Sequence, residues 1–266
     1  MSIYATKGKS LEYAPFGLDI YKTCPHGCLY CYNTTQSEKS KKPEEFHAGA
    51  VPIMRSPEKL RKSIATQAER FKAISAEDKR VLLSFGSDPY PAVEESMEIT
   101  KAALELLVEY GVPFQTLTKN PRVALRDIDL FKKGDGRFAS TVLFLDENLR
   151  EKWEPGAPPV AERLECLKEA HDQGVFTWVS VEPVISTRQA ISLIEEASDY
   201  VDLWKVGKLN HHPLADTIDW KDFANSVHWA LLATDKSFII KNSLAAYLPA
   251  GKRWSRIIYK DSQKSD

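Results

Sequence analysis

The chain has 266 residues, of which 43% are hydrophobic, enough to bury a large core in a single domain. Its 36 Lys and Arg residues nearly balance its 37 Asp and Glu residues, and the net charge is -1. That balance excludes a global field that would draw the whole protein onto nucleic acid or an anionic membrane. The apolar runs fall far short of the roughly 18 to 20 residues that cross a bilayer, and residues 1–7 lack the apolar stretch of a signal peptide. We therefore expect a cytoplasmic protein with no membrane association.

Short apolar runs rich in β-branched residues alternate along the chain with segments of helical periodicity. Helices are expected within residues 97–108, 160–171 and 190–197, and Phe238–Lys241 can add a seventh strand to six others. The six predicted buried strands are Leu18–Tyr21, Val81–Phe85, Phe114–Thr118, Ser140–Leu145, Thr177–Val181 and Val201–Val206. Strands joined by helices through right-handed crossovers predict an α/β fold, a partial (β/α)6 TIM-like barrel with parallel strands.

The domain organisation follows from the same pattern. We assign residues 1–248 to one barrel domain and residues 249–266 to a C-terminal extension. That extension is expected to be partly disordered, because Lys260–Asp266 is almost entirely polar. The polar segment Lys39–Glu45 is expected to be an exposed loop.

Three of the four cysteines, Cys24, Cys28 and Cys31, are clustered, while Cys166 stands alone. This is not the spread of a secreted disulfide framework, so the cluster indicates a metal or redox site. Three thiolates on one loop suit an iron-sulfur cluster and leave one iron without a protein ligand. A structural zinc site needs four ligands, and His26 or a distant side chain would have to supply the fourth. The alternative is therefore a zinc-stabilised binding module without catalytic activity.

Residues 24–32, CPHGCLYCY, resemble the cysteine motif of the radical S-adenosylmethionine (SAM) superfamily, and in particular its spore photoproduct lyase-like branch. The resemblance extends through much of residues 13–210. Three further segments resemble motifs of that branch: Phe85–Tyr90 followed by Glu94, residues 117–120 with Arg126 and Asp127, and Glu154–Pro155 with Arg163–Leu164.

The resemblance implies a radical SAM core in which Cys24, Cys28 and Cys31 hold a 4Fe-4S cluster whose remaining iron binds SAM. SAM is then cleaved reductively to methionine and a 5'-deoxyadenosyl radical, which abstracts hydrogen from a substrate. An external low-potential donor such as flavodoxin or ferredoxin would supply the electron. The branch suggests nucleic acid as the substrate of a lesion lyase or modifying enzyme, but the charge balance gives this no support. One cluster is expected, because Cys166 alone cannot hold a second.

Polar residues at the carboxyl ends of the predicted strands are candidates for SAM contacts, since that end of a parallel sheet carries the binding loops. Lys119 can pair with the SAM carboxylate, and Asp88 or Glu182 can accept from its amino or ribose groups. Ser87 and Ser180 offer hydroxyls at the same ends. The alternative for all five is a loop-capping or salt-bridging role.

Further candidates come from the motif and from the remaining strand ends. By its motif position Tyr30 lies near the adenine, or it anchors the loop as an apolar group. Ser140 and Thr141 are weaker candidates, because they begin their predicted strand. Lys241 and Asn242 end the seventh strand and can line the substrate side.

Three other features are expected to be structural. Glu154 and Arg163 should form an ion pair that fixes a loop. Residues 210–212, Asn-His-His, should form a solvated turn rather than a metal site. Cys166 lies on an apolar helical face and should be a buried thiol. Because lyases of the resembling branch use a cysteine to return hydrogen to the product, this placement of Cys166 weakens a lyase assignment.

Overall fold

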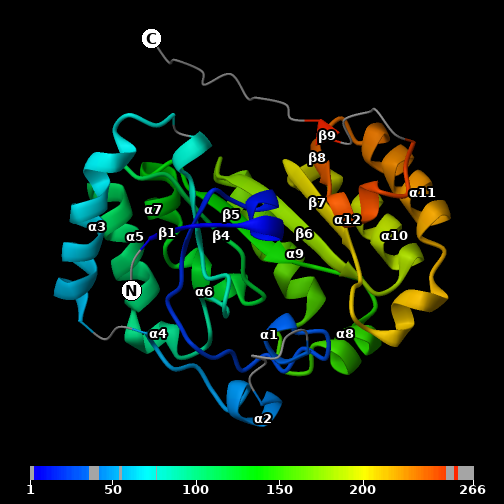
Figure 1. Cartoon of the computed structure of the whole chain (residues 1–266), viewed down its shortest axis with the longest axis horizontal. Helices are drawn as coiled ribbons and strands as arrows, with labels where there is room; N and C mark the ends of the chain where they lie inside the picture. Colours follow the sequence, from blue (N-terminus) through cyan, green and yellow to red (C-terminus); the bar gives the residue numbers. More distant parts are fainter. Residues whose placement is uncertain (1–2, 36–41, 54–55, 76, 250–254, 257–266) are drawn as a thin grey trace.

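The computed structural model describes residues 3–35, 42–53, 56–75, 77–249 and 255–256. In this part of the chain a nine-stranded sheet forms the centre of the molecule, and its strand order follows the chain order (Figure 1). The strands are β1 (Tyr4–Ala5), β2 (Phe16–Leu18), β3 (Val81–Leu83), β4 (Phe114–Thr116), β5 (Arg137–Thr141), β6 (Phe176–Val184), β7 (Leu203–Lys208), β8 (Ser237–Ile240) and β9 (Ser255–Arg256). Strands β2 to β8 are parallel, whereas β1 and β9 pair antiparallel at the two edges.

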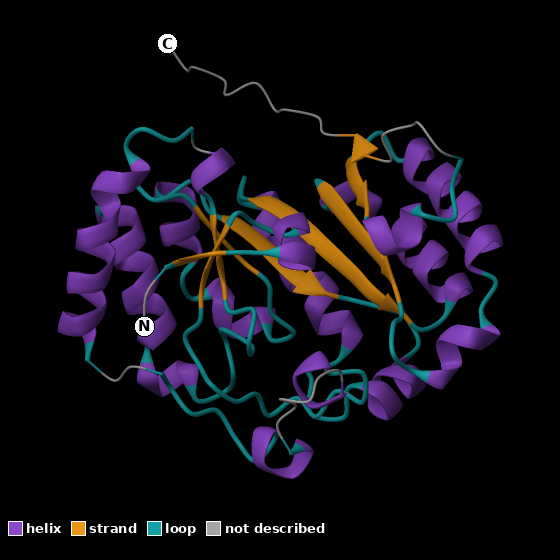
Figure 2. Cartoon of the chain, viewed as in Figure 1, coloured by secondary structure: helices purple, strands orange, loops and turns teal. Residues whose placement is uncertain are grey.

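Helices surround the sheet, with α3, α5 and α7 at one end and α10 and α11 at the other (Figures 1 and 2). The arrowheads of β6 and β7 point toward the side of the molecule where α1 and α8 lie. The helices are α1 (Tyr32–Thr35), α2 (Pro43–Phe46), α3 (Pro57–Phe71), α4 (Glu94–Met97), α5 (Ile99–Glu109), α6 (Pro121–Leu125), α7 (Ile128–Lys133), α8 (Glu147–Trp153), α9 (Val160–Asp172), α10 (Thr187–Ala197), α11 (Trp220–Ala233) and α12 (Asn242–Ala245). Short 3-10 turns are η1 (Gly8–Glu12), η2 (Glu77–Lys79), η3 (Ser198–Tyr200) and η4 (Pro213–Thr217).

Both faces of the parallel strands are buried, which explains their continuous apolar runs. In β6, Val179 and Val181 pack in the large core shared with the helices. Trp178, which precedes Val179, belongs to a separate, smaller cluster that includes Leu82 of β3 and Leu203 of β7. Successive side chains of a strand point to opposite faces, so the two clusters are the outer and inner sides of one curved sheet. This is the α/β barrel-like architecture that the sequence predicts.

All six predicted strands differ from the observed strands at one or both ends, and the first and the fourth show the physical reason. The first parallel strand ends at Leu18, because Ile20 and Lys22 instead hydrogen-bond to the backbone of Ile53 and Val51. These loop pairings bury the apolar residues that suggested a later strand. The strand expected at Ser140–Leu145 is β5, which begins at Arg137 and ends at Thr141. Residues 142–145 are largely buried but continue as a loop.

The remaining predictions on organisation have mixed outcomes. The seventh parallel strand expected at Phe238–Lys241 is β8. The expected loop Lys39–Glu45 is partly helical, because Pro43 begins the short helix α2, and residues 39–41 lie outside the described residues. The C-terminal extension contributes β9, although residues 260–266 also lie outside the described part. The domain boundary at residue 248 stays a prediction. No helix in the described ranges is long and apolar enough to cross a membrane.

Glu94 joins three parts of the fold with one fully buried carboxylate. It accepts from the hydroxyl of Tyr21 at 2.6 Å and from the guanidinium of Arg126 at 3.1 Å. It also accepts from the backbone NH groups of residues 99–101, which are the first turn of α5. These NH groups have no partner within the helix, and their dipoles favour an anion at this position. Glu94 therefore holds the β3–α5 region to the β2 end and to the α6–α7 turn.

Replacing Glu94 by alanine should lower the free energy of unfolding by about 3 kcal/mol, since removing one partner of a buried pair leaves the others unsatisfied. The matched control is Glu95→Ala, the exposed neighbour on the same helix, which should cost less than about 0.5 kcal/mol. Denaturant unfolding followed by circular dichroism measures both. Equal effects of the two substitutions would contradict the role assigned to Glu94.

Candidate active site

The cysteine loop connects β2 to α1 and carries the clustered thiols. Cys24, Cys28 and Cys31 are all free, and Cys28 is buried. Gly27 has a φ of 63°, a left-handed conformation that glycine adopts without strain. The backbone NH of Cys31 donates to the carbonyl of Cys28 at 3.1 Å. The loop thereby turns so that all three cysteines line one cavity of about 370 Å³.

Nine of the residues that the sequence suggests as metal ligands or SAM contacts line this cavity. The other walls come from the segments that follow β3 and β4 and from β6, at the carboxyl edge of the parallel sheet. The nine residues are Cys24, Cys28, Tyr30, Cys31, Ser87, Asp88, Lys119, Ser180 and Glu182. The structure thus brings them together, while their individual contacts with SAM stay predictions.

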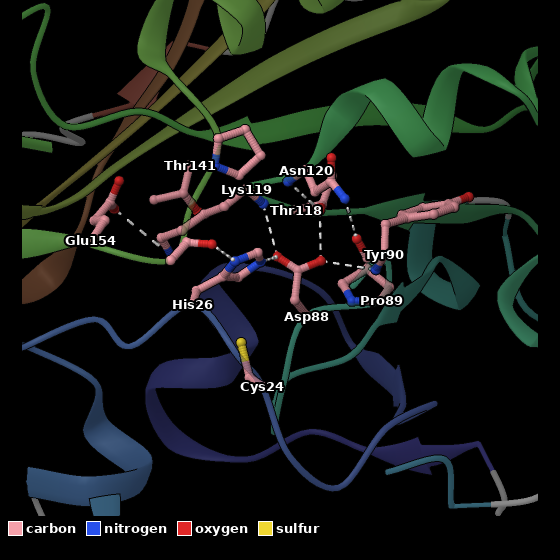
Figure 3. A network of polar contacts seen from close by, with 12 residues as sticks. Cys24, His26, Asp88, Pro89, Tyr90, Thr118, Lys119, Asn120, Thr141 and Glu154 are labelled. Carbon is pink, nitrogen blue, oxygen red and sulfur yellow. Dashed lines mark hydrogen bonds and ion pairs between the residues drawn. The ribbon is translucent and has the colours of Figure 1, made fainter. Parts of the chain in front are cut away.

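The carboxylate of Asp88 connects several segments on the cysteine side of the cavity (Figure 3). One oxygen accepts from the backbone NH of Tyr90 at 2.8 Å and from the hydroxyl of Thr118 at 2.6 Å. The other accepts from the backbone NH of Lys119 at 2.8 Å and lies 3.0 Å from Nε2 of His26. Burial alone would raise the pKa of this carboxyl, but His26 and the hydrogen bonds lower it to about 2. Protein donors therefore already surround the Asp88 carboxylate.

Glu154 is a second buried carboxylate on the same side. Its Oε2 accepts from the guanidinium of Arg163 at 2.6 Å, and neither side chain is exposed, which confirms the predicted ion pair. Its Oε1 accepts from the hydroxyl of Tyr30 and lies 4.0 Å from the ammonium of Lys119. Burial alone would raise the pKa of Glu154, but Arg163, Lys119 and the Tyr30 hydroxyl keep it below its ordinary value. Tyr30 is thus anchored through its hydroxyl as well as its ring.

Lys119 lies between the cysteines and Glu154. Its ammonium is 5.5 Å from the centroid of the Tyr30 ring, and its side chain is 16% exposed. Burial alone would lower the pKa of Lys119, but the sulfur atoms of Cys28 and Cys24 and the carboxylate of Glu154 raise it above its ordinary value. Lys119 therefore presents a cation at the wall that carries the thiols.

The cavity is also lined by a residue that sequence reasoning missed, Tyr13. Its hydroxyl donates to Glu182 and lies 3.1 Å from the hydroxyl of Ser180. The ammonium of Lys241 binds the same carboxylate, lies 3.8 Å from Glu12 and lies 4.0 Å from the centroid of the Tyr13 ring. Tyr13 precedes the first parallel strand and belongs to no motif, so no local signal marked it. Lys241 lines the cavity, as its position at the end of the seventh strand suggested.

Thr141 lies at the other end of its strand from the one predicted. It was expected to begin its strand, but it ends β5 and lines the cavity. The reason is that β5 begins at Arg137, directly after Gly136, three residues earlier than the apolar run suggested. Ser140 donates to the carbonyl of Thr118 at 2.8 Å, and Ser87 donates to the carbonyl of Tyr21 at 2.7 Å. Both hydroxyls therefore hold backbone segments in place.

The segment at residues 210–212 and the fourth cysteine behave as structural elements. Asn210 lines the cavity and donates to the carbonyl of Lys208 at 2.9 Å. Nδ1 of His212 accepts from the backbone NH two residues later, and its ring packs against Trp153. Asn242 begins α12. Cys166 is fully buried in α9, as predicted, and burial raises the pKa of its thiol to about 12.

The donor set fits an iron-sulfur cluster that leaves one iron open. Three free thiols share one wall, whereas both ring nitrogens of His26 face protein acceptors and Nδ1 of His47 lies 2.8 Å from the carbonyl oxygen of Cys24. His26 is thus not placed as a fourth ligand of a closed zinc site, whereas the contact of His47 occupies only one of its two ring nitrogens. Burial raises the pKa of Cys24, and it raises that of Cys28 to about 11, so metal loading must displace thiol protons. Within the described ranges, no three or more His, Cys, Asp or Glu side chains are already gathered around a position for one metal ion.

Comparison with known proteins identifies the family. A model of the radical SAM superfamily matches residues 18–200, so the chain belongs to that superfamily, whose members use a 4Fe-4S cluster and SAM. An uncharacterized protein of Methanocaldococcus jannaschii is 29% identical over 107 residues, which cover 40% of this chain and 40% of that protein.

Solved structures share the fold at low sequence identity. Streptococcus suis SuiB bound to SAM superimposes with a TM-score of 0.62 and 13% identity, over 89% of this chain and 53% of SuiB. A cysteine-to-serine variant of spore photoproduct lyase superimposes with a TM-score of 0.60 and 16% identity, over 80% of this chain and 62% of the lyase. The chain therefore spans about half to three fifths of these proteins, and the likeness establishes the fold.

Iron content should separate the clustered cysteines from Cys166. After anaerobic reconstitution and desalting, the wild-type protein and Cys166→Ala should each hold about four iron atoms per chain, because Cys166 lies away from the cavity. Cys28→Ala should lose most of its iron, since two thiolates are too few to retain the cluster. Iron well above four per chain in the wild type, or unchanged iron in Cys28→Ala, would contradict the assignment.

Proposed function

We propose that this protein cleaves SAM reductively and uses the resulting radical to modify a substrate held in the same cavity. The observation that carries the proposal is the wall on which three free thiols and the Lys119 ammonium stand together, at the carboxyl edge of the sheet. When bound there, the cluster supplies the electron that breaks a carbon–sulfur bond of SAM, giving methionine and a 5'-deoxyadenosyl radical. Cys24, Cys28 and Cys31 would hold the cluster, and its remaining iron would take SAM.

Lys119 is the strongest candidate for a SAM contact among the residues predicted at strand ends. Its ammonium faces the cavity and has a carboxylate no nearer than the 4.0 Å contact with Glu154 among the described residues. A carboxylate of SAM can therefore bind it at little cost in broken contacts. By contrast, Asp88 and Ser87 already bond within the protein, which favours positioning roles for both.

The Tyr13 side of the cavity is the proposed place for the ribose or the substrate. Glu182 and Ser180 lie there together with Lys241, so this wall offers an acceptor, hydroxyls and an ammonium. Hydrogen bonds fix all of these groups before any ligand binds, so little reorganisation is needed when one does. The cysteine wall would bind the amino acid part of SAM, and the radical carbon would face this second wall.

Two of the solved structures bear on the substrate class. SuiB has been solved with its precursor peptide, and a spore photoproduct lyase variant with a dinucleoside spore photoproduct, so one fold accepts very different substrates. A nucleic-acid substrate stays a candidate for this chain, but its net charge of -1 gives no support. A lyase that returns hydrogen from a cysteine is disfavoured, because Cys166 is buried in α9 and does not line the cavity. We propose modification rather than lesion cleavage, in the cytoplasm, with flavodoxin or ferredoxin as electron donor.

The proposal predicts slow formation of 5'-deoxyadenosine without any substrate. Reconstituted protein given SAM and dithionite should release 5'-deoxyadenosine and methionine in equal amounts, because the site is complete before substrate binds. Cys28→Ala should reduce the rate to that of a protein-free control, whereas Cys166→Ala should retain it. Liquid chromatography with mass spectrometry measures both products. If the fully loaded wild type binds SAM yet gives no 5'-deoxyadenosine, with or without DNA, RNA and peptide panels, the proposed function is wrong.

A further inference from the structure

His26 links the cysteine loop to two other segments of the cavity wall. It lies between Cys24 and Cys28 and is only 3% exposed. Its Nε2 lies 3.0 Å from Asp88 (Figure 3), and its Nδ1 lies 3.2 Å from the carbonyl oxygen of Gly156. The backbone NH of Gly156 donates back to the carbonyl of His26 at 2.9 Å. A Cβ at position 156 would lie 2.5 Å from the carbonyl oxygen of Pro25, so this close approach requires glycine.

The contacts of His26 close a ring that contains Lys119. Asp88 accepts from the backbone NH of Lys119 at 2.8 Å, and the Lys119 ammonium lies 4.0 Å from Glu154. Glu154 lies two residues before Gly156, and the carbonyl oxygen of Gly156 contacts His26, which closes the ring. The side chains of His26, Asp88 and Glu154 are buried, where hydrogen bonds and ion pairs are stronger than in water, whereas Lys119 is partly exposed and Gly156 is exposed. The position of Lys119 is thus tied at both its backbone and its ammonium to the cysteine loop.

Tyr30 adds a second link on the other side of Cys28. Its hydroxyl donates to Glu154, the carboxylate that also faces the Lys119 ammonium. The loop that carries the metal ligands is therefore attached, before and after Cys28, to the same two carboxylates that hold Lys119. A lysine side chain has a flexible four-carbon stem with considerable rotamer entropy, so its ammonium is well placed only when its surroundings fix it.

We propose that His26 is a positioning residue of the SAM site: through Asp88 it holds Lys119 at a fixed place beside the metal-binding loop. The inference rests on the proposed function, in which Lys119 binds the SAM carboxylate. The cysteines hold iron by their own thiolates, whereas SAM binding also needs the ammonium in register with the open iron. A binding group that is displaced by about 1 Å can lose much of its contribution to ligand binding. Iron retention and SAM affinity are therefore separate properties, and His26 controls the second.

A double-mutant cycle between His26 and Lys119 tests the positioning role of His26. The dissociation constant for SAM is measured by equilibrium dialysis on anaerobically reconstituted protein without reductant. His26→Ala should raise the Kd for SAM about tenfold while the iron content stays at the wild-type level. Lys119→Ala should raise the Kd by at least as much. The double variant should bind SAM no more weakly than Lys119→Ala alone, because the effect of His26 passes through Lys119.

Conservative variants and matched controls separate positioning from general stability. His26→Gln should recover part of the affinity, because its amide can still donate to Asp88. His171→Gln changes a histidine of α9 that does not line the cavity, and it should leave the Kd unchanged. Asp88→Asn should weaken SAM binding, whereas Asp202→Asn should lower only the melting temperature. Asp202 is also buried, but it bonds the backbone at the start of β6.

The outcomes distinguish this inference from the function on which it rests. If Lys119→Ala leaves the Kd unchanged, the proposed SAM contact of Lys119 fails, and the positioning role fails with it. If Lys119→Ala weakens binding but His26→Ala and Asp88→Asn do not, only the positioning role is overturned. It is equally overturned if the effects of His26→Ala and Lys119→Ala add, or if His26→Ala and His26→Gln both lose iron, which would make His26 a support of the cysteine loop alone.

Discussion

The buried ion pair between Glu154 and Arg163 is the interaction on which the site depends. Neither side chain is exposed, and an isolated ion at such a place would cost several kcal/mol. The cost is offset because Arg163 also donates to the carbonyls of Thr141 and Pro158, which fixes the end of β5 and the loop before α9. With Glu154 held there as an anion, a phenol and an ammonium are drawn toward it from the cysteine loop and from the segment after β4. The arrangement of the thiol-bearing wall thus follows from a need to pair buried charge.

Each of the two walls of the cavity contains a carboxylate that is paired with donors of the protein, but the two carboxylates have different roles. On the thiol side, Asp88 is surrounded by donors and acts on ligands only through the residues that it holds. On the other side, Glu182 is shared by a phenol and an ammonium, while its wall remains open to the cavity. A radical reaction needs a site whose polar groups are satisfied in advance, so that water and stray hydrogen donors stay out. The structure meets that need with buried, paired groups.

Much of this could be predicted from the sequence, because the informative signals are local. The spacing of Cys24, Cys28 and Cys31 and the alternation of apolar runs with helical periodicity depend on neighbouring residues. The ends of the strands are predicted less accurately. The reason is that residues 142–145 are largely buried although they lie beyond the hydrogen-bonded end of β5. Tyr13 and the partners of His26 could not be predicted at all. Their contacts join residues 169 and 62 positions apart, and no single-sequence pattern encodes such a pairing.

The most direct test of the central claim is electron paramagnetic resonance of the reconstituted, dithionite-reduced protein with and without SAM. The account predicts a reduced 4Fe-4S signal whose g values change when SAM is added, because the three cysteines leave one iron open to that ligand. A loaded cluster whose spectrum is indifferent to saturating SAM, or a protein that takes up zinc and no iron under the same anaerobic conditions, would contradict it.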